Sequence, residues 1–272
     1  MLLIFNSICT MKKKSFSILS IVVGVTLSNY RYARKAEQIL KNTGIKGGLI
    51  VTIGYNEGKL ACALHKNKRF LIHGLIKDKE KIQNARNYIH KKNLYGSVSM
   101  ELWDGKQLPH TDNLVNLLVM KERGNTPVRE ILRVLAPNGM AYFRKDGEWE
   151  QIKKSRPGNI DEWTHHLHDA SNNAVAQDAR IAPLQNLQWN GGPMYSRSHE
   201  LIPSIRAMVS SNGRIFYIID EAPLGIKDPR IPCQWKLVAR DAYNGIILWK
   251  QPIFGDSSAV YSKSLNRNRW VG

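Results

Sequence analysis

The sequence predicts an α/β domain built on a mostly parallel sheet, followed by a stretch of antiparallel β-structure. Between residues 31 and 145, short apolar runs alternate with amphipathic helical stretches, the pattern of a parallel sheet. After residue 161, apolar runs alternate with tight turns instead. The charge changes at the same place: residues 1–160 hold 28 Lys and Arg against 12 Asp and Glu, and residues 161–272 hold 12 against 10. Two unlike parts therefore meet near residue 160.

The elements of the first domain follow from its hydrophobic pattern. We expect strands over residues 47–53, 69–75, 98–102, 114–120 and 140–144. Helices are expected over 30–42, in a stretch ending at residue 64, and over 79–92 and 127–135. The 79–92 helix places Ile82, Ala85 and Ile89 on one face. The polar stretch 146–160 is expected to be a linker, with one hairpin turn at Asp146-Gly147.

The N-terminus has the pattern of an export signal. Lys12, Lys13 and Lys14 follow Met11, the expected start, and an apolar run extends from Phe16 to Leu27. The run is shorter than the roughly 20 residues of a membrane span. We expect cleavage shortly after Leu27 and a periplasmic or secreted protein, with an uncleaved N-terminal anchor as the alternative.

A glycine-containing turn follows the first strand and leads into a helix. The turn reads Gly54-Tyr55-Asn56-Glu57-Gly58, and such strand–turn–helix units bind the polar groups of nucleotides. Trp103-Asp104-Gly105 ends the third strand, and the segment 132–139 reads LRVLAPNG. In this order, the motifs resemble class I S-adenosylmethionine-dependent methyltransferases. The resemblance implies S-adenosylmethionine as the cofactor, bound by Gly54, Asn56, Gly58 and Asp104, with Asp104 on the adenine amino group.

The sequence departs from the family at several contact positions. Asn56 replaces the middle glycine, Thr52 replaces the acid before the loop, and Ile76 stands where an acid holds the ribose, with Asp78 two places late. Residues 116–119, NLLV, stand in place of the substrate motif Asn/Asp-Pro-Pro-Tyr/Phe. Loss of the ribose acid weakens cofactor binding on the order of 10- to 1,000-fold. No catalytic residue is assigned, and both a working methyltransferase and a fold without catalysis stay open.

Histidines and acids gather just after the predicted linker. His165 and His168 have HxxH spacing and Asp169 follows them, which permits a metal site. We favour a structural role and predict no metal, because the segment resembles the opening strand of quinoprotein-type β-propellers. Trp163 and Asp169, then Trp189 further along, carry that resemblance.

The segment 235–249 is the most specific β-motif of the chain. It resembles the repeat of pyrroloquinoline-quinone-type propellers through Ala239, Asp241, Gly245 and Trp249. Asn244-Gly245 predicts a hairpin turn, Asp241 can accept hydrogen bonds from its free N–H groups, and Trp249 would pack against a neighbouring blade. In a lone blade we expect five alternating residues to be left uncovered: Ile215, Tyr217, Ile219, Leu237 and Ile247.

The sequence thus predicts an exported fusion of a methyltransferase-like domain with an incomplete propeller, because residues 161–272 are too few for the roughly four to eight blades of a ring. The expected partners are the remaining blades and a substrate or protein that the sequence does not identify. We do not expect pyrroloquinoline quinone to bind this fragment. Nucleic-acid binding is not expected either, since the lysines are scattered. Three functions compete: a methyltransferase, a non-catalytic binding or scaffold protein, and the N-terminal piece of a quinoprotein oxidoreductase.

Overall fold

The computed structural model describes residues 27–179, 187–192, 205–225 and 230–253. The predicted export signal lies outside the described residues, apart from Leu27. Within the described part of the chain, no helix is long and apolar enough to cross a membrane.

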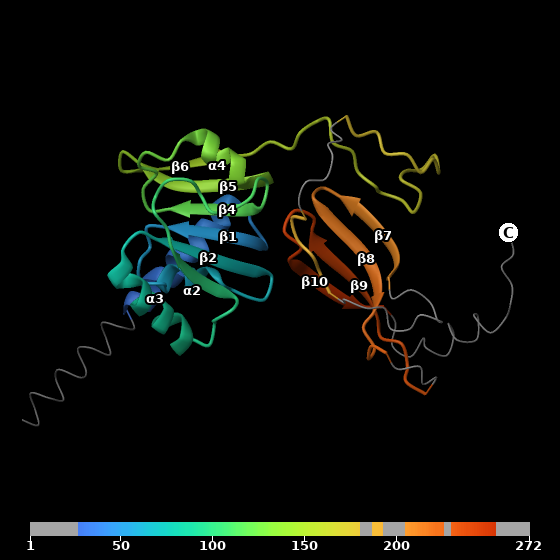
Figure 1. Ribbon diagram of the computed structural model, residues 1–272, viewed down its shortest axis with the longest axis horizontal. Helices are drawn as coiled ribbons and strands as arrows, with labels where there is room; N and C mark the ends of the chain where they lie inside the picture. Colours follow the sequence, from blue (N-terminus) through green and yellow to red (C-terminus); the bar gives the residue numbers. More distant parts are fainter. Residues whose placement is uncertain (1–26, 180–186, 193–204, 226–229, 254–272) are drawn as a thin grey trace, which may run out of the picture.

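The first domain is a six-stranded sheet flanked by helices (Figure 1). The strand order is β3-β2-β1-β4-β5-β6; the first five strands are parallel and β6 is antiparallel. This Rossmann-like order confirms the predicted α/β class. The strands are β1 (Gly48–Ile53), β2 (Phe70–Ile76), β3 (Val98–Leu102), β4 (Val115–Met120), β5 (Leu135–Lys145) and β6 (Glu148–Lys153). The helices are α2 (Lys59–Leu64), α3 (Lys79–Lys91), α4 (Val128–Val134) and a helix over residues 27–43.

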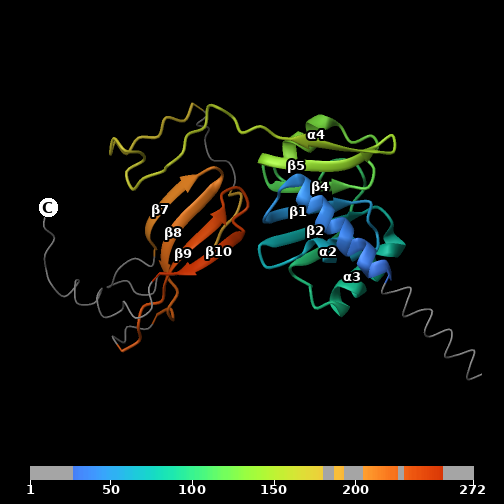
Figure 2. The same cartoon turned by 180° about the vertical axis from the view of Figure 1, so that it is seen from behind.

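Helices cover both faces of this sheet. On one face, the helix 27–43, α2 and α3 pack apolar side chains against β1, β2 and β4, and Figure 2 shows the helix 27–43 lying across that face. Ile82, Ala85 and Ile89 of α3 are buried there, as the period of the sequence predicts. On the other face, α4 and the loop after β3 cover a second core. Because the parallel strands are buried on both faces, they read as continuous apolar runs.

The last strand of the sheet comes from the polar stretch expected to be a linker. Asp146 and Gly147 have φ values of 51° and 89°, and they form the tight turn predicted at that position. The turn brings β6 back alongside β5 as an antiparallel edge strand. β5 begins at Leu135, five residues before the expected strand 140–144. Its register on β4 shifts between Leu135 and Met140, where Asn138 has a φ of 65° and its N–H donates to Lys154 O at 2.9 Å.

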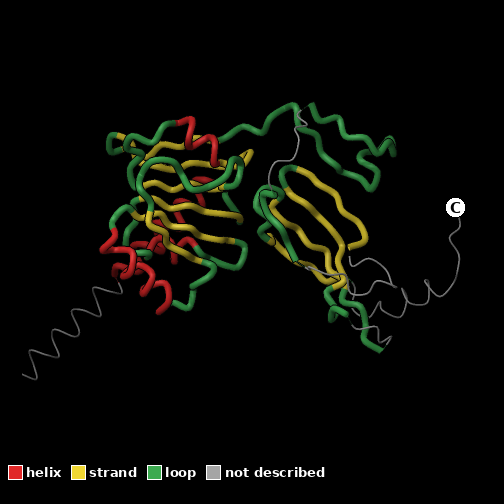
Figure 3. Tube along the Cα trace, viewed as in Figure 1, coloured by secondary structure: helices red, strands yellow, loops and turns green. Residues whose placement is uncertain are grey.

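The second part is a four-stranded antiparallel sheet whose neighbours follow one another in sequence (Figure 3). Its strands are β7 (Ile205–Ser211), β8 (Arg214–Asp220), β9 (Trp235–Asp241) and β10 (Ile247–Pro252). The expectation that Tyr217 and Ile219 would be uncovered is wrong: they are 6% and 2% exposed. They pack with Val238, and the Arg240 guanidinium lies over the Tyr217 ring at 5.8 Å. The other three residues of the predicted set are half-buried.

The second sheet is attached to the amino ends of the parallel strands. Asn116 in β4 donates from Nδ2 to Asp241 Oδ2 at 2.7 Å, and its Oδ1 accepts from Asn244 Nδ2 at 2.6 Å and from Leu49 N at 2.8 Å. Leu248 in β10 lies against Gly47, just before β1. Figures 1 and 2 both show the sheets side by side in this way. The carboxyl ends of the parallel strands, where α/β folds bind ligands, therefore point away from the second sheet.

Candidate functional site

The loop after β1 requires glycine at two positions. Gly54 and Gly58 have φ values of 81° and 69°, a region that favours glycine. A Cβ at Gly58 would lie 3.1 Å from the carbonyl oxygen of Ala85 in α3, so the start of α2 packs closely on α3. A Cβ at Gly54 would lie 3.1 Å from Lys121 Cβ, just after β4. The two glycines therefore hold the loop against its neighbours, while the half-buried Asn56 lies between them.

Thr52 does not replace the missing acid of the loop. Its side chain is 1% exposed, and its hydroxyl has no hydrogen-bond partner. A Cβ at Gly74 in β2 would lie 3.2 Å from that hydroxyl and would collide with the Met100 side chain. Thr52 is therefore enclosed in the core between strands and is not directed at a ligand.

The residue at the position of the ribose-binding acid is buried in the same way as Thr52. Ile76, the residue aligned with the ribose acid, is fully buried. Lys77 follows it and lies over the Trp103 ring, with Nζ 5.0 Å from the ring centroid and against Gly105. Asp78 caps α3 by accepting from Glu80 N at 3.0 Å, so it is committed to the helix. A cation, and not a carboxylate, thus stands at the carboxyl end of β2.

Asp104 is the best-placed of the predicted cofactor residues. It is exposed just after β3, and its Oδ1 accepts from Lys106 N at 2.9 Å, which shapes the loop that begins there. Cofactor contacts at Asp104, Gly54, Asn56 and Gly58 stay predictions.

The position assigned to the missing substrate motif was wrong. Asn116 lies near the amino end of β4, where it binds the second sheet, and β4 ends at Met120. The residues that reach the carboxyl edge are therefore Lys121 and its successors. Sequence reasoning also missed a group of cations at this edge, formed by Lys35, Lys121 and Arg144. Their sequence separation gave no signal that they would meet.

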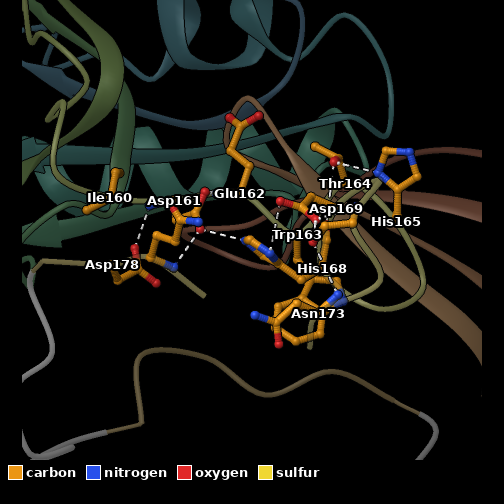
Figure 4. A network of polar contacts seen from close by, with 12 residues as sticks. Ile160, Asp161, Glu162, Trp163, Thr164, His165, His168, Asp169, Asn173 and Asp178 are labelled. Atoms are coloured by element: carbon orange, nitrogen blue, oxygen red, sulfur yellow. Dashed lines mark hydrogen bonds and ion pairs between the residues drawn. The ribbon is translucent and has the colours of Figure 1, made fainter. Parts of the chain in front are cut away.

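The histidine-rich segment 161–178 forms a hydrogen-bonded loop, here called the clasp (Figure 4). His168 is 4% exposed, its Nε2 lies 2.6 Å from Asp161 Oδ2, and its ring meets Trp163 edge-on. Asp161 also accepts from the backbone N–H groups of Gln177 and Glu162, and these bonds, with His168, lower its pKa to about 2. Within the described residues, no group of three His, Cys, Asp or Glu side chains could hold a metal.

The first residues of the clasp form hydrogen bonds with the second sheet. Trp163 N donates to Ser210 Oγ at 3.1 Å, and Ser210 N donates to Trp163 O at 2.7 Å. Glu162 accepts from Asn212 N at 2.6 Å. Residues 162–163 therefore lie beside the end of β7.

The predicted role of Asp241 in its turn is confirmed. Its Oδ1 accepts from Tyr243 N at 2.9 Å and Asn244 N at 3.1 Å. Gly245 has a φ of 71°, and the Trp189 ring packs against it while Trp189 Nε1 donates to Ala242 O at 3.0 Å. The turn is thus closed from inside by a carboxylate and covered from outside by an indole.

Comparison with solved structures gives distant similarities for the α/β domain. No protein-family profile matches the chain, and no curated protein matches it. A structure assigned as an S-adenosyl-L-methionine-dependent methyltransferase of Methanococcus maripaludis is 31% identical over 41% of this chain and 54% of its own, with a TM-score of 0.39. One assigned as a sarcosine dimethylglycine methyltransferase of Galdieria sulphuraria is 18% identical over 42% of this chain and 46% of its own, at 0.38.

A SAM-dependent methyltransferase from Aquifex aeolicus is 20% identical over 42% of this chain and 68% of its own, with a TM-score of 0.36. The chain spans about half the length of the first two structures. What the α/β domain binds has to be inferred from its own residues.

Proposed function

We propose that the α/β domain is a binding module with a methyltransferase-like fold. It lacks several of the side chains that bind S-adenosylmethionine in working methyltransferases. The observation that carries this proposal is the carboxyl end of β2, where Ile76 is buried and Lys77 lies over Trp103. S-adenosylmethionine has a sulfonium and an ammonium group against one carboxylate. A lysine at this edge repels such a cation, whereas an acid would bind its ribose.

Calorimetric titration of the full chain with S-adenosylmethionine tests the proposal. We expect weak or undetectable binding, and a dissociation constant in the low micromolar range would contradict it. Lys77→Asp should strengthen binding by about tenfold or more, because it removes the repulsion and supplies an acceptor. Lys68→Asp makes the same charge change in an exposed loop at the amino end of β2, so it should leave the affinity unchanged.

A working methyltransferase is the second candidate, and the exposed Asp104 favours it. The carboxylate stands just after β3, where the family resemblance places the residue that binds the adenine amino group. If the titration detects tight binding, Asp104→Ala should weaken it about tenfold. Tight binding that Asp104→Ala leaves intact would contradict this assignment of the adenine contact.

We further propose that the second sheet is one blade of a β-propeller. The antiparallel order β7 to β10, the Asp241 turn and the half-buried Trp249 support this interpretation. If Trp249 serves mainly to pack on an adjoining blade, Trp249→Ala should cost clearly less stability in this chain than Tyr217→Ala, which removes a core side chain. Urea unfolding of the two variants measures the difference, and equal costs would contradict the blade interpretation.

Export is proposed from the sequence alone. Lys12–Lys14 and the apolar run from Phe16 to Leu27 support it. N-terminal sequencing of the mature protein should find a start shortly after Leu27. A cytoplasmic product that retains Lys12 would contradict export.

A further inference from the structure

A strongly basic groove lies at the carboxyl edge of the α/β sheet, between the helix 27–43 and the hairpin of β5 and β6. Its volume is about 930 Å³. The charged side chains that line it are Arg31, Arg34, Lys35, Lys41, Arg144 and a single acid, Glu37. Five cations against one acid therefore give the groove a local excess of positive charge. No residue of the loops that the cofactor resemblance concerns lines the groove, although Tyr55 of the loop after β1 contacts Lys35.

Lys35 is the central cation of this groove. Its Nζ lies 4.7 Å from the Tyr55 ring centroid and 5.0 Å from that of Trp149, and the side chain is half-buried. Burial, followed by the nearby charges of Arg144, Arg31 and Lys121, lowers the pKa of Lys35. Among the described residues, no carboxylate forms an ion pair with Lys35 or Arg144, and the Arg144 guanidinium donates to Gly147 O at 2.8 Å. A partly buried cation next to other cations is costly unless an anion joins them.

Lys121 adds positive charge beside the groove, close to the ends of the central strands. Lys121 packs against Gly54, so it stands between the ends of β1 and β4, where the strand order reverses. Ligands of open α/β sheets bind at such a reversal. Lys35 lies over the ring of Tyr55, a side chain only 8% exposed whose enclosed hydroxyl has no hydrogen-bond partner.

The aromatic residues of the groove hold the cations and do not offer a free stacking surface. Tyr142 and Trp149 stack on each other with centroids 4.6 Å apart, and both Lys35 and Arg144 lie over the Trp149 ring. A ligand in this groove would therefore meet positive charge and not an open aromatic face.

We propose that this groove binds a small molecule through a compact oxyanion, such as a phosphate or sulfate ester. Lys35, Arg144 and Arg31 supply the positive charge, and arginine and lysine donors form their strongest hydrogen bonds with such groups. The inference does not depend on whether the loops after β2 and β3 bind S-adenosylmethionine.

The test is calorimetric titration of the full chain with inorganic pyrophosphate and with sulfate, at low ionic strength. We expect at least one of them to bind with a dissociation constant below about 1 mM. The preferred anion distinguishes a phosphate site from a sulfate site. Failure of both to bind would overturn the proposal.

Matched variants separate a built site from general electrostatics. Lys35→Met keeps the apolar stem and removes the charge, so it should weaken binding about tenfold without lowering the melting temperature. Lys68→Met removes an exposed lysine elsewhere and should leave binding unchanged within about twofold. Equal losses in both variants would overturn the proposal. Tighter binding of a short DNA duplex than of either anion, lost in Lys35→Met, would also overturn it and indicate a nucleic-acid surface.

Discussion

Removal of the Asn116 side chain would test how firmly the two sheets are joined. The amide makes three hydrogen bonds, to Leu49 N, Asn244 Nδ2 and Asp241 Oδ2. A bond to a charged group contributes about 1.5–3 kcal/mol and a neutral bond about 0.5–1.5 kcal/mol. Asn116→Ala should therefore lower the free energy of unfolding by about 3 kcal/mol. Asn87→Ala, which removes an exposed amide on α3, should cost less than about 0.5 kcal/mol.

A double-mutant cycle isolates the contact between the two sheets. Asn116→Ala, Asp241→Ala and the double variant are compared by urea unfolding, followed by tryptophan fluorescence and far-ultraviolet circular dichroism. The expected coupling energy is about 1–3 kcal/mol, because the two side chains bond directly across the interface. A coupling energy within error of zero would refute the docking described above.

The pH dependence gives the same contact a second readout. Burial raises the pKa of Asp241, and the bond from Asn116 opposes that rise. Because the pKa of Asp241 is higher in the folded state than in the unfolded state, the folded state gains stability as pH falls through the folded pKa. Above that pKa, the buried ionised carboxylate lowers the free energy of unfolding. Without Asn116 the pKa rises further. The penalty of Asn116→Ala should thus be larger at pH 7 than at pH 4, and equal penalties would contradict the argument.

Three further predictions concern the α/β domain. Gly58→Ala should destabilise by about 1 kcal/mol more than Gly44→Ala in thermal unfolding, since the φ values are 69° and 67° but only Gly58 would meet the Ala85 carbonyl; equal costs would contradict this. Burial lowers the pKa of His110 to about 4, so the stability contributed by its neutral ring is present above about pH 6.5 and is lost as pH falls towards 4. His110→Phe should therefore make the free energy of unfolding less dependent on pH between about 6.5 and 4, and an unchanged pH dependence would refute this. Tyr55→Phe should change the unfolding free energy by less than about 0.5 kcal/mol, because its hydroxyl has no partner; a loss above about 1 kcal/mol would reveal a missed bond.

The sequence was sufficient to predict the α/β framework because buried parallel strands carry a strong local signal. The strand at 98–102 was predicted with the bounds of β3, and the helix at 79–92 differs from α3 by one residue. Local turn chemistry was equally informative at Asp146-Gly147 and at Asp241. In each case the residues that decide the structure lie within a few positions of one another.

Contacts between distant segments could not be predicted in this way. Asn116 sits in an apolar strand, and its partner Asp241 is 125 residues further along the chain. The cations Lys35, Lys121 and Arg144 come from a helix, a strand end and a hairpin, so no spacing rule connects them. Both sites arise from the strand order, which brings the amino ends together at one edge and the carboxyl ends at the other.

The amino and carboxyl ends of the parallel strands therefore differ in what surrounds them. At the amino end, Asp241 uses Oδ1 to close its own turn and Oδ2 to bind Asn116, so the turn that shapes the second sheet also attaches it. At the carboxyl end, positive charge gathers around Lys35 without an anionic partner among the described residues. An attachment at the carboxyl end would have covered the edge where α/β sheets bind ligands. Attachment at the amino end keeps that edge accessible, and it makes ligand binding and domain docking separable by mutation.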